Sequence, residues 1–175
     1  MKIFVFAENT NALLELSFGM RERGYHVEAI AIGEINGSFA DKVWMIPFQY
    51  GVPFQGYAET IASLIKEEKP NILLIESTKR CKLIADQLAS TLGTTVTNDI
   101  EFIRFVNNIQ HLINKGDSVK KEKAANTTKI LMVDEGAIKV SIKTEVDEEV
   151  ETIQFIPPLY RTKKHAVEAY RFQNA

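Results

Sequence analysis

Residues 58–100 read AETIASLIKEEKPNILLIESTKRCKLIADQLASTLGTTVTNDI, and this stretch predicts a helix, a strand, a loop, a helix and a strand in that order. Apolar residues at helical spacing end before Pro70, because a proline disfavours helical geometry in the residue that precedes it. The unbroken apolar run at residues 72–75 is typical of a strand that is covered on both faces, as in a parallel sheet. A second helical pattern ends at Gly93, and glycine commonly caps helix C-termini.

The chain before this stretch has the same alternation of strands and helices. Residues 2–7, 27–32 and 42–46 predict strands, and an amphipathic helical pattern separates the first two. A strand, a helix and a strand in close succession form a right-handed parallel crossover. Through Val96 the sequence therefore predicts five mainly parallel strands with helices on both faces, which is an open, doubly wound α/β sheet of Rossmann-like type.

From residue 101 onward the apolar period becomes two and turn residues cluster, which predicts β-hairpins. We therefore expect residues 101–158 to extend the sheet as antiparallel strands within one α/β domain of residues 1–158, whose parallel core is residues 1–100. Residues 159–175 predict a C-terminal helix or tail. The alternating apolar positions are Ile138, Val140 and Ile142, followed by Ile153 and Phe155.

The composition excludes several classes of function. The chain has 21 basic and 23 acidic residues, and its formal net charge of −2 predicts no binding to nucleic acid. No apolar run approaches the ~20 residues of a membrane-spanning helix. A single cysteine forms no internal disulfide, which favours a reducing, cytoplasmic location. The three histidines stand far from one another and from metal-ligand partners, so no metal site is predicted.

Polar residues follow the predicted strands at the edge where open parallel sheets bind ligands. Ser77, Thr78 and Lys82 surround the start of a helix, where free N–H groups and the helix dipole favour an anion. The same residue types also cap helices and end strands without any ligand, and both interpretations stay open. The candidate residues for an anion or nucleotide site at this edge are Glu8, Asn9, Ser77, Thr78, Lys82, Asn98 and Asp99.

Motifs for catalysis are missing from the sequence. It contains neither G-x-G-x-x-G nor G-x-x-x-x-G-K-[ST], and Ser77 does not lie in a G-x-S-x-G elbow. Cys81 falls on the apolar face of its helix, which favours an inert buried thiol over a nucleophile. We therefore predict no catalytic residues in this chain and no enzymatic activity.

A series of short motifs follows a recognisable order along the chain. They are Val5-Phe6-Ala7-Glu8, Leu13-Leu14-Glu15, Ala40-Asp41-Lys42-Val43, Glu68-Lys69-Pro70, Glu76-Ser77-Thr78, Ile84-Ala85, Leu92-Gly93-Thr94 and Asn98-Asp99-Ile100. In wording and order they resemble the N-terminal domain of the electron transfer flavoprotein alpha subunit. The resemblance covers residues 2–142.

This resemblance implies an adenine nucleotide alpha-hydrolase-like fold. In the family, a glycine-rich C-terminal domain holds most of the FAD, and the N-terminal domain packs against the beta subunit. These 175 residues contain no such glycine-rich domain, and Cys81, Asp86 and Asp134 stand where the family has glycine, proline and arginine. We therefore expect this chain alone to bind no flavin, and FAD, with AMP as a further candidate, to be bound only in a complex with partner subunits.

Two functions follow from these observations. The first is an alpha-subunit-like scaffold or docking module in flavin-dependent electron transfer, whose partner is a beta-like subunit, a separate flavin domain or a second copy of the chain. The second is a small protein that binds an adenine nucleotide or another anion at the edge near Ser77.

Overall fold

The helices and strands of the chain alternate over its first hundred residues. The computed structural model describes residues 2–100, 128–138, 140 and 146–158. In chain order its elements are β1 (Lys2–Phe6), α1 (Thr10–Glu22), β2 (His26–Ile32), β3 (Lys42–Ile46), the short 3-10 helix η1 (Phe54–Tyr57), α2 (Ala58–Glu68), β4 (Ile72–Glu76), α3 (Lys79–Leu92), β5 (Val96–Ile100), β6 (Lys129–Val133) and β7 (Glu149–Thr152).

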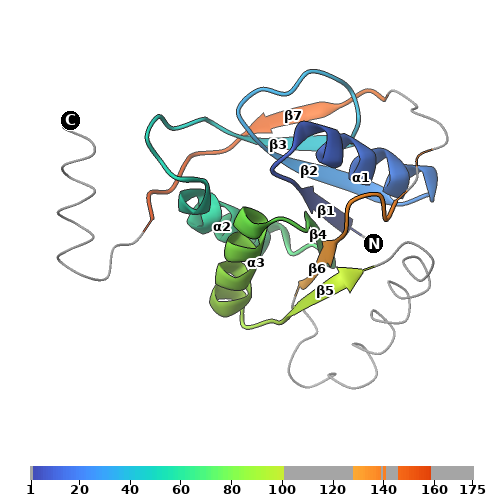
Figure 1. Cartoon of the computed structure of the whole chain (residues 1–175). Helices are drawn as coiled ribbons and strands as arrows, with labels where there is room; N and C mark the ends of the chain where they lie inside the picture. The colour runs from blue at the N-terminus through green and yellow to red at the C-terminus, as the bar shows by residue number, and fades with distance from the viewer. Residues whose placement is uncertain (1, 101–127, 139, 141–145, 159–175) are drawn as a thin grey trace, which may run out of the picture.

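The described strands form one sheet in the order β5-β6-β4-β1-β2-β3-β7, and every neighbouring pair is parallel (Figure 1). The α/β class and the five predicted strands through Val96 are confirmed. Strand β1 has β2 as its neighbour on one side in the sheet and β4 as its neighbour on the other side. The order of the strands therefore reverses between β1 and β4, and the carboxyl ends of these two strands meet there.

The prediction that residues 101–158 extend the sheet as antiparallel strands is wrong for β6 and β7, the two strands that the structure describes after residue 128. β6 lies between β4 and β5 and is parallel to both, and β7 pairs in parallel with β3 at the far edge of the sheet. The four residues of the run at 130–133 are all buried, because the strand has neighbours on both sides and cover on both faces. A continuous apolar run is typical of such a strand. Because turn residues stand close to this run, sequence reasoning assigned it to a hairpin.

Ile138 and Val140, the alternating positions after β6 that the structure describes, do not lie in a strand. Ile138 instead packs on helix α1, where a Cβ on Gly19 would come within 2.0 Å of the Ile138 Cγ2. Glycine at this position therefore lets the segment after β6 lie directly on the helix. Ile142, the predicted turns between residues 107 and 127 and the predicted tail of residues 159–175 lie outside the described residues.

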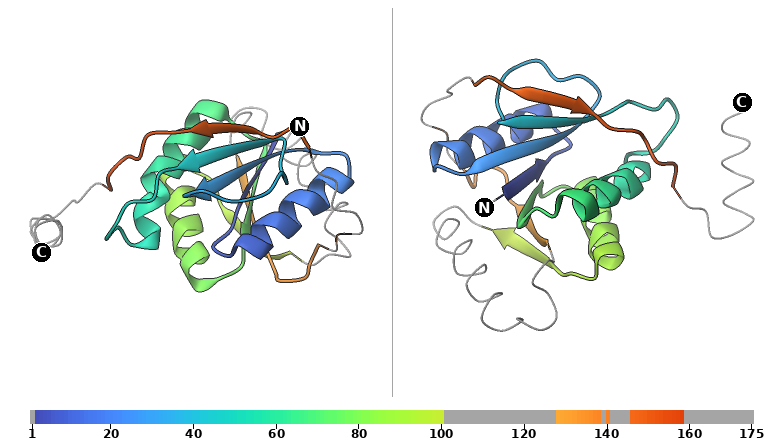
Figure 2. Two further views of the ribbon diagram at one scale, coloured as in Figure 1. Left: turned by 90° about the horizontal axis from the view of Figure 1, so that it is seen from above. Right: turned by 180° about the vertical axis from the view of Figure 1, so that it is seen from behind.

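Two apolar layers cover the sheet, one on each face. Ile3 and Val5 point toward the layer that contains α1, whereas Phe4 and Phe6 point toward the layer formed with α2 and α3. Two views of the molecule show α1 on one face and the other two helices on the opposite face (Figure 2). This is the doubly wound arrangement that the sequence predicts. None of the described helices combines the length and the apolar character that crossing a membrane requires.

Local signals set the helix boundaries around the central strand. Helix α2 ends with Lys69 in the left-handed conformation (φ 48°), directly before Pro70. Helix α3 begins after Thr78, whose side chain accepts a hydrogen bond from the Cys81 N–H, and it ends at Gly93 with a φ of 68°. These boundaries place the start of α3 beside the end of β4, at the point where the strand order reverses.

Candidate functional site

Two glutamates dominate the point where the strand order reverses. Glu76 is the last residue of β4, and its carboxylate accepts hydrogen bonds from the Glu8 N–H at 2.9 Å and the Asn9 N–H at 3.1 Å. The Asn9 side-chain amide donates a third hydrogen bond to it at 2.7 Å. The residues that follow β1 are thereby tied to the end of β4.

The second carboxylate, that of Glu8, joins this loop to helix α3. It accepts a hydrogen bond from the Thr78 hydroxyl at 2.9 Å and forms an ion pair with Arg80. The Arg80 guanidinium also lies 5.3 Å from the centre of the Phe54 ring. Two carboxylates and one guanidinium thus occupy the space in front of the helix N-terminus, and their polar groups satisfy one another.

Thr78 has two partners and acts as the N-cap of α3. Its hydroxyl oxygen accepts from the Cys81 N–H at 3.1 Å while its O–H donates to Glu8. Cys81 itself is fully buried under the helix. Burial raises the pKa of the Cys81 thiol to about 11, and hydrogen bonds to Thr78 and to the Glu8 backbone do not offset this effect.

The remaining candidates do not converge on this point. Ser77 is exposed, and its N–H donates to the Val133 carbonyl at 3.0 Å. The Lys82 ammonium contacts Asp86 at 3.1 Å, one turn further along α3, and so does not reach back to the loop. Asp86 stands where the family resemblance leads one to expect proline, which could not provide this contact.

Asn98 and Asp99 lie inside strand β5 rather than after it. Strand β6 separates β5 from β4, so the structure does not bring these residues to the end of β4. The reason is the parallel insertion of β6, which moves β5 to the outer edge of the sheet. Of the seven candidate residues, the structure brings together Glu8, Asn9 and Thr78.

Sequence reasoning missed Glu76 and Arg80 as members of this site. Glu76 ends an apolar strand and so points into the loops at the strand's carboxyl end, a position that could have singled it out. Arg80 looked like one of several solvated cations at the start of a helix. Only the fold shows that it faces Glu8. Among the described residues, no group of three or more His, Cys, Asp or Glu side chains is arranged to hold a metal ion.

Comparison with known proteins agrees with this architecture. The model of the electron transfer flavoprotein domain matches residues 5–158. The chain belongs to the electron transfer flavoprotein domain family. This finding confirms the resemblance from the sequence, and it extends the match through strand β7.

Individual members of the electron transfer flavoprotein family are related to the chain at low identity. YdiR of Escherichia coli K12, named as a candidate electron transfer flavoprotein subunit, is 25% identical over 166 residues, which are 89% of this chain and 53% of YdiR. Protein FixB of Salmonella typhimurium is 23% identical over 95% of this chain and 57% of FixB. The chain spans about half the length of these curated relatives.

The first expected result for this electron transfer flavoprotein domain concerns the helix cap. Thr78→Val removes the hydroxyl that accepts from Cys81 and donates to Glu8, so we expect a loss of ~1–2 kcal/mol in the free energy of unfolding. Thr78→Ser keeps the hydroxyl and should lose less than half of that. Urea unfolding of both variants checks the result, and equal losses would contradict the role of the hydroxyl.

The second expected result concerns the buried thiol. The pKa of Cys81 is raised in the folded state from 9.0 to about 11, so the folded protein holds this proton more tightly than the unfolded chain does. The contribution of Cys81 to stability is therefore complete below about 9 and is lost as the pH rises toward 11. We expect a thiol reagent to modify Cys81 only after denaturation, and a Cys81→Ala variant to lack this part of the alkaline decline. Rapid modification of the native protein would contradict the burial.

Proposed function

We propose that this chain is an alpha-subunit-like docking module of an electron transfer flavoprotein system and not a catalyst. The observation that carries the proposal is the closed polar network at the switch point of the sheet. Glu8 and Glu76 satisfy their hydrogen-bonding capacity with Asn9, Thr78, Arg80 and backbone N–H groups of the same chain. A network of this kind stabilises the junction of β1, β4 and α3, and it presents few unpaired groups to a substrate.

The chemistry of the described residues supports a non-enzymatic role. Cys81 is buried and its raised pKa keeps it a neutral thiol, which is a poor nucleophile. His26, the histidine within the described residues, lies at the start of β2 and therefore at the opposite edge of the sheet. No described histidine thus stands beside the switch point, and the Glu8 and Glu76 carboxylates there are paired with Asn9, Thr78 and Arg80. A cytoplasmic location belongs to the same proposal and rests on the single cysteine of the sequence.

The described residues do not fit the pyrophosphate of FAD at this edge. A pyrophosphate binds where a helix N-terminus offers free N–H groups and positive charge. Here the Cys81 N–H already donates to Thr78, and Glu8 and Glu76 place two carboxylates before the helix. We propose that FAD, and AMP as a further candidate, are bound only when partner subunits supply the binding residues.

The alternative function is the binding of an adenine nucleotide or another anion, and the Glu8 and Glu76 carboxylates disfavour it. Binding of AMP or a small anion near Ser77 stays a prediction. The side chains of Glu8 and Glu76 make it less favourable than the sequence alone indicates, and Lys82 pairs with Asp86 instead of facing the loop. Within the network of described residues, Arg80 is the cation at this edge, and Glu8 neutralises it.

Purification of the 175-residue chain, alone and co-expressed with a beta-like electron transfer flavoprotein subunit, tests the proposal. We expect a colourless protein alone and a stable complex on co-expression. Stoichiometric flavin absorbance in the protein alone would contradict the cofactor proposal, and failure to recover any complex would contradict the docking role. Calorimetric titration with AMP and with phosphate separates the alternative: micromolar AMP binding that Arg80→Ala abolishes would favour a nucleotide site.

A further inference from the structure

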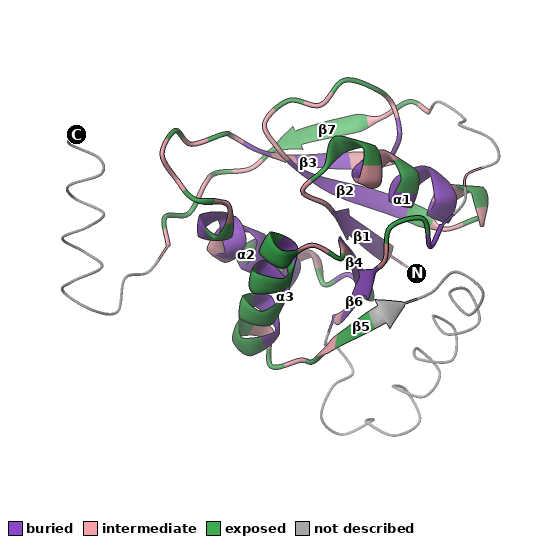
Figure 3. Cartoon of the chain, in the orientation of Figure 1, coloured by how far each residue is buried: buried purple, intermediate pink, exposed green. Residues whose placement is uncertain are grey.

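The segment of residues 146–158 lies at the outer edge of the sheet and is held differently from the inner strands. None of its residues is buried, and the four residues of β7 are all exposed. Strands β1 to β4 and β6 are mainly buried, as the colouring by burial makes visible (Figure 3). Burial of apolar surface in β7 itself therefore contributes little to its attachment. Just after it, Ile153 and Phe155 pack on the layer that contains α2 and α3, and the Phe155 ring lies 5.4 Å from that of Tyr57.

Carboxylates make the side-chain contacts of residues 148–151 with β3 and the residues before it. The Glu148 carboxylate accepts from the backbone N–H groups of Phe39 at 2.9 Å and Ala40 at 3.1 Å. The Lys42 ammonium lies 3.0 Å from the Glu151 carboxylate and 3.6 Å from that of Glu149. Three glutamates within four residues are thus matched by two free amides and one cation on or beside β3.

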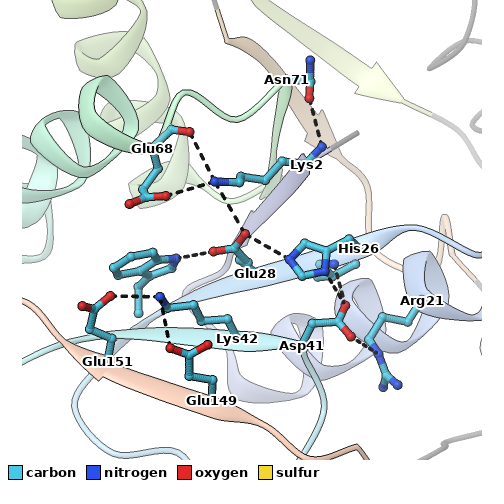
Figure 4. A network of polar contacts seen from close by, with 12 residues as sticks. Lys2, Arg21, His26, Glu28, Asp41, Lys42, Glu68, Asn71, Glu149 and Glu151 are labelled. Atoms are coloured by element: carbon cyan, nitrogen blue, oxygen red, sulfur yellow. Dashed lines mark hydrogen bonds and ion pairs between the residues drawn. The ribbon is translucent and has the colours of Figure 1, made fainter.

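Lys42, the cation that pairs with these glutamates, is held in place by other residues of the sheet. The Lys42 ammonium lies 3.8 Å from the centre of the Trp44 ring, and the Trp44 indole N–H donates to the buried Glu28 carboxylate at 2.9 Å (Figure 4). Burial acts to lower the pKa of Lys42, but the hydrogen bonds and charges of Glu151 and Glu149 outweigh this effect and raise it. We name the surface formed by Phe39, Ala40, Lys42 and Trp44 the β3 edge.

Backbone hydrogen bonds also join the segment to β3 and to the residue before it, and such bonds require an extended strand. The Glu149 N–H donates to the Asp41 carbonyl at 3.3 Å, and the Ile153 N–H donates to the Met45 carbonyl at 2.9 Å. Beyond β7, Ile156 exchanges hydrogen bonds with Thr60 of α2. The β3 edge therefore recognises an extended strand through its backbone and an acidic strand through its side chains.

We propose that the β3 edge is a recognition site for an acidic extended strand, and that a second copy of this chain supplies residues 146–158 to it by reciprocal exchange. Four strands separate β6 from β7 in the sheet, so β7 can be contributed by another copy while every inner strand keeps its neighbours. Exchange of identical elements reproduces each contact between the copies. The inference does not depend on the proposed function.

Charge reversal gives a direct test. Lys42→Glu places a carboxylate opposite the chain's own Glu149 and Glu151, and the Glu149→Lys/Glu151→Lys double variant places two cations opposite its own Lys42. Each variant alone should release its β7, because like charges then face each other. In an equal mixture, exchange pairs opposite charges at both edges. We expect each variant to sediment as a monomer and the mixture to form a dimer containing one copy of each.

Trp44 reports the state of the edge within each variant, since it is the single tryptophan of the sequence. We expect its emission to shift in each variant alone and to return to the wild-type value in the mixture. Lys66→Glu, an exposed change on α2, is the matched control and should leave both the emission and the mass unchanged. A mixture that stays monomeric although both variants show the shifted emission would overturn exchange between copies.

A peptide of residues 146–158 provides a second measurement that does not need the mixture. The Glu149→Lys/Glu151→Lys chain keeps Lys42 and should bind the labelled peptide at least tenfold more tightly than the Lys42→Glu chain does. Equal affinities, or no binding to either chain, would overturn the recognition of an acidic strand. Unchanged Trp44 emission in both variants would equally show that the charges do not hold β7.

Discussion

Phe4→Ala is expected to lower the free energy of unfolding by ~3–5 kcal/mol, because it removes a large side chain from a layer that cannot collapse around the space. Phe4 is fully buried in β1, the strand at the middle of the sheet. Its ring lies 6.4 Å from that of Trp44, in the layer between the sheet and helices α2 and α3. Urea unfolding followed by circular dichroism measures the loss.

Phe48→Ala is the matched control for this prediction. Phe48 is 66% exposed in the loop after β3, so the same deletion should change the free energy of unfolding by no more than ~0.5 kcal/mol. Similar losses for the two variants would contradict the central position of Phe4. A small loss for Phe4→Ala alone would mean that the layer repacks around the missing ring.

Glu28→Ala is expected to lower the free energy of unfolding by ~2–4 kcal/mol, since it leaves buried or partly buried donors without their acceptor. The Glu28 side chain is 5% exposed, and its carboxylate lies 2.9 Å from the Trp44 indole nitrogen, 3.1 Å from the His26 Nε2 and 3.9 Å from the Lys2 ammonium. Removing the carboxylate also removes the acceptor of the Trp44 indole N–H, so we expect the Trp44 side chain in β3 to become less well ordered. Urea unfolding monitored by Trp44 fluorescence tests both effects.

Glu28→Gln separates the charge of this residue from its shape. The amide oxygen still accepts from the Trp44 indole, whereas the attraction to Lys2 is lost, so we expect about half the loss caused by alanine, ~1–2 kcal/mol. The Lys2 side chain is 33% exposed and its ammonium lies 3.9 Å away, so this ion pair contributes little by itself. A loss for Glu28→Gln as large as that for Glu28→Ala would assign the stabilisation to the charge and not to the hydrogen bond.

The strands after residue 128 are the part of the fold that sequence reasoning assigned wrongly. The run at 130–133 carries the same unbroken apolar pattern as residues 72–75, and both strands are in fact inner strands with parallel neighbours. Strand β7 has no apolar pattern, because all four of its residues are exposed and its attachment rests on charges. Hydrophobic periodicity cannot predict a strand that buries no hydrophobic face.

The candidate site was predicted only in part, for a related reason. Thr78 as a helix cap and Cys81 as a buried thiol follow from local sequence, since capping and helical spacing act within one turn. The pairing of Glu76 with Asn9 joins residues far apart in the chain, so local spacing does not encode it. Lys82 and Asp86 stand four residues apart on α3, so helical spacing encodes their contact, but sequence reasoning turned Lys82 toward the loop instead.

The sequence by itself determined the helices, the five strands through Val96 and the two-sided cover of the sheet, because periodicity, proline and glycine act over a few residues. Only the tertiary structure decided the order of the strands, which inserts β6 beside β4 and carries β7 to the opposite edge. It also decided that two carboxylates and Arg80 close the switch point. The physical reason is that strand pairing and charge pairing depend on which distant segments meet, and the free energy of those contacts exists only once the chain has folded.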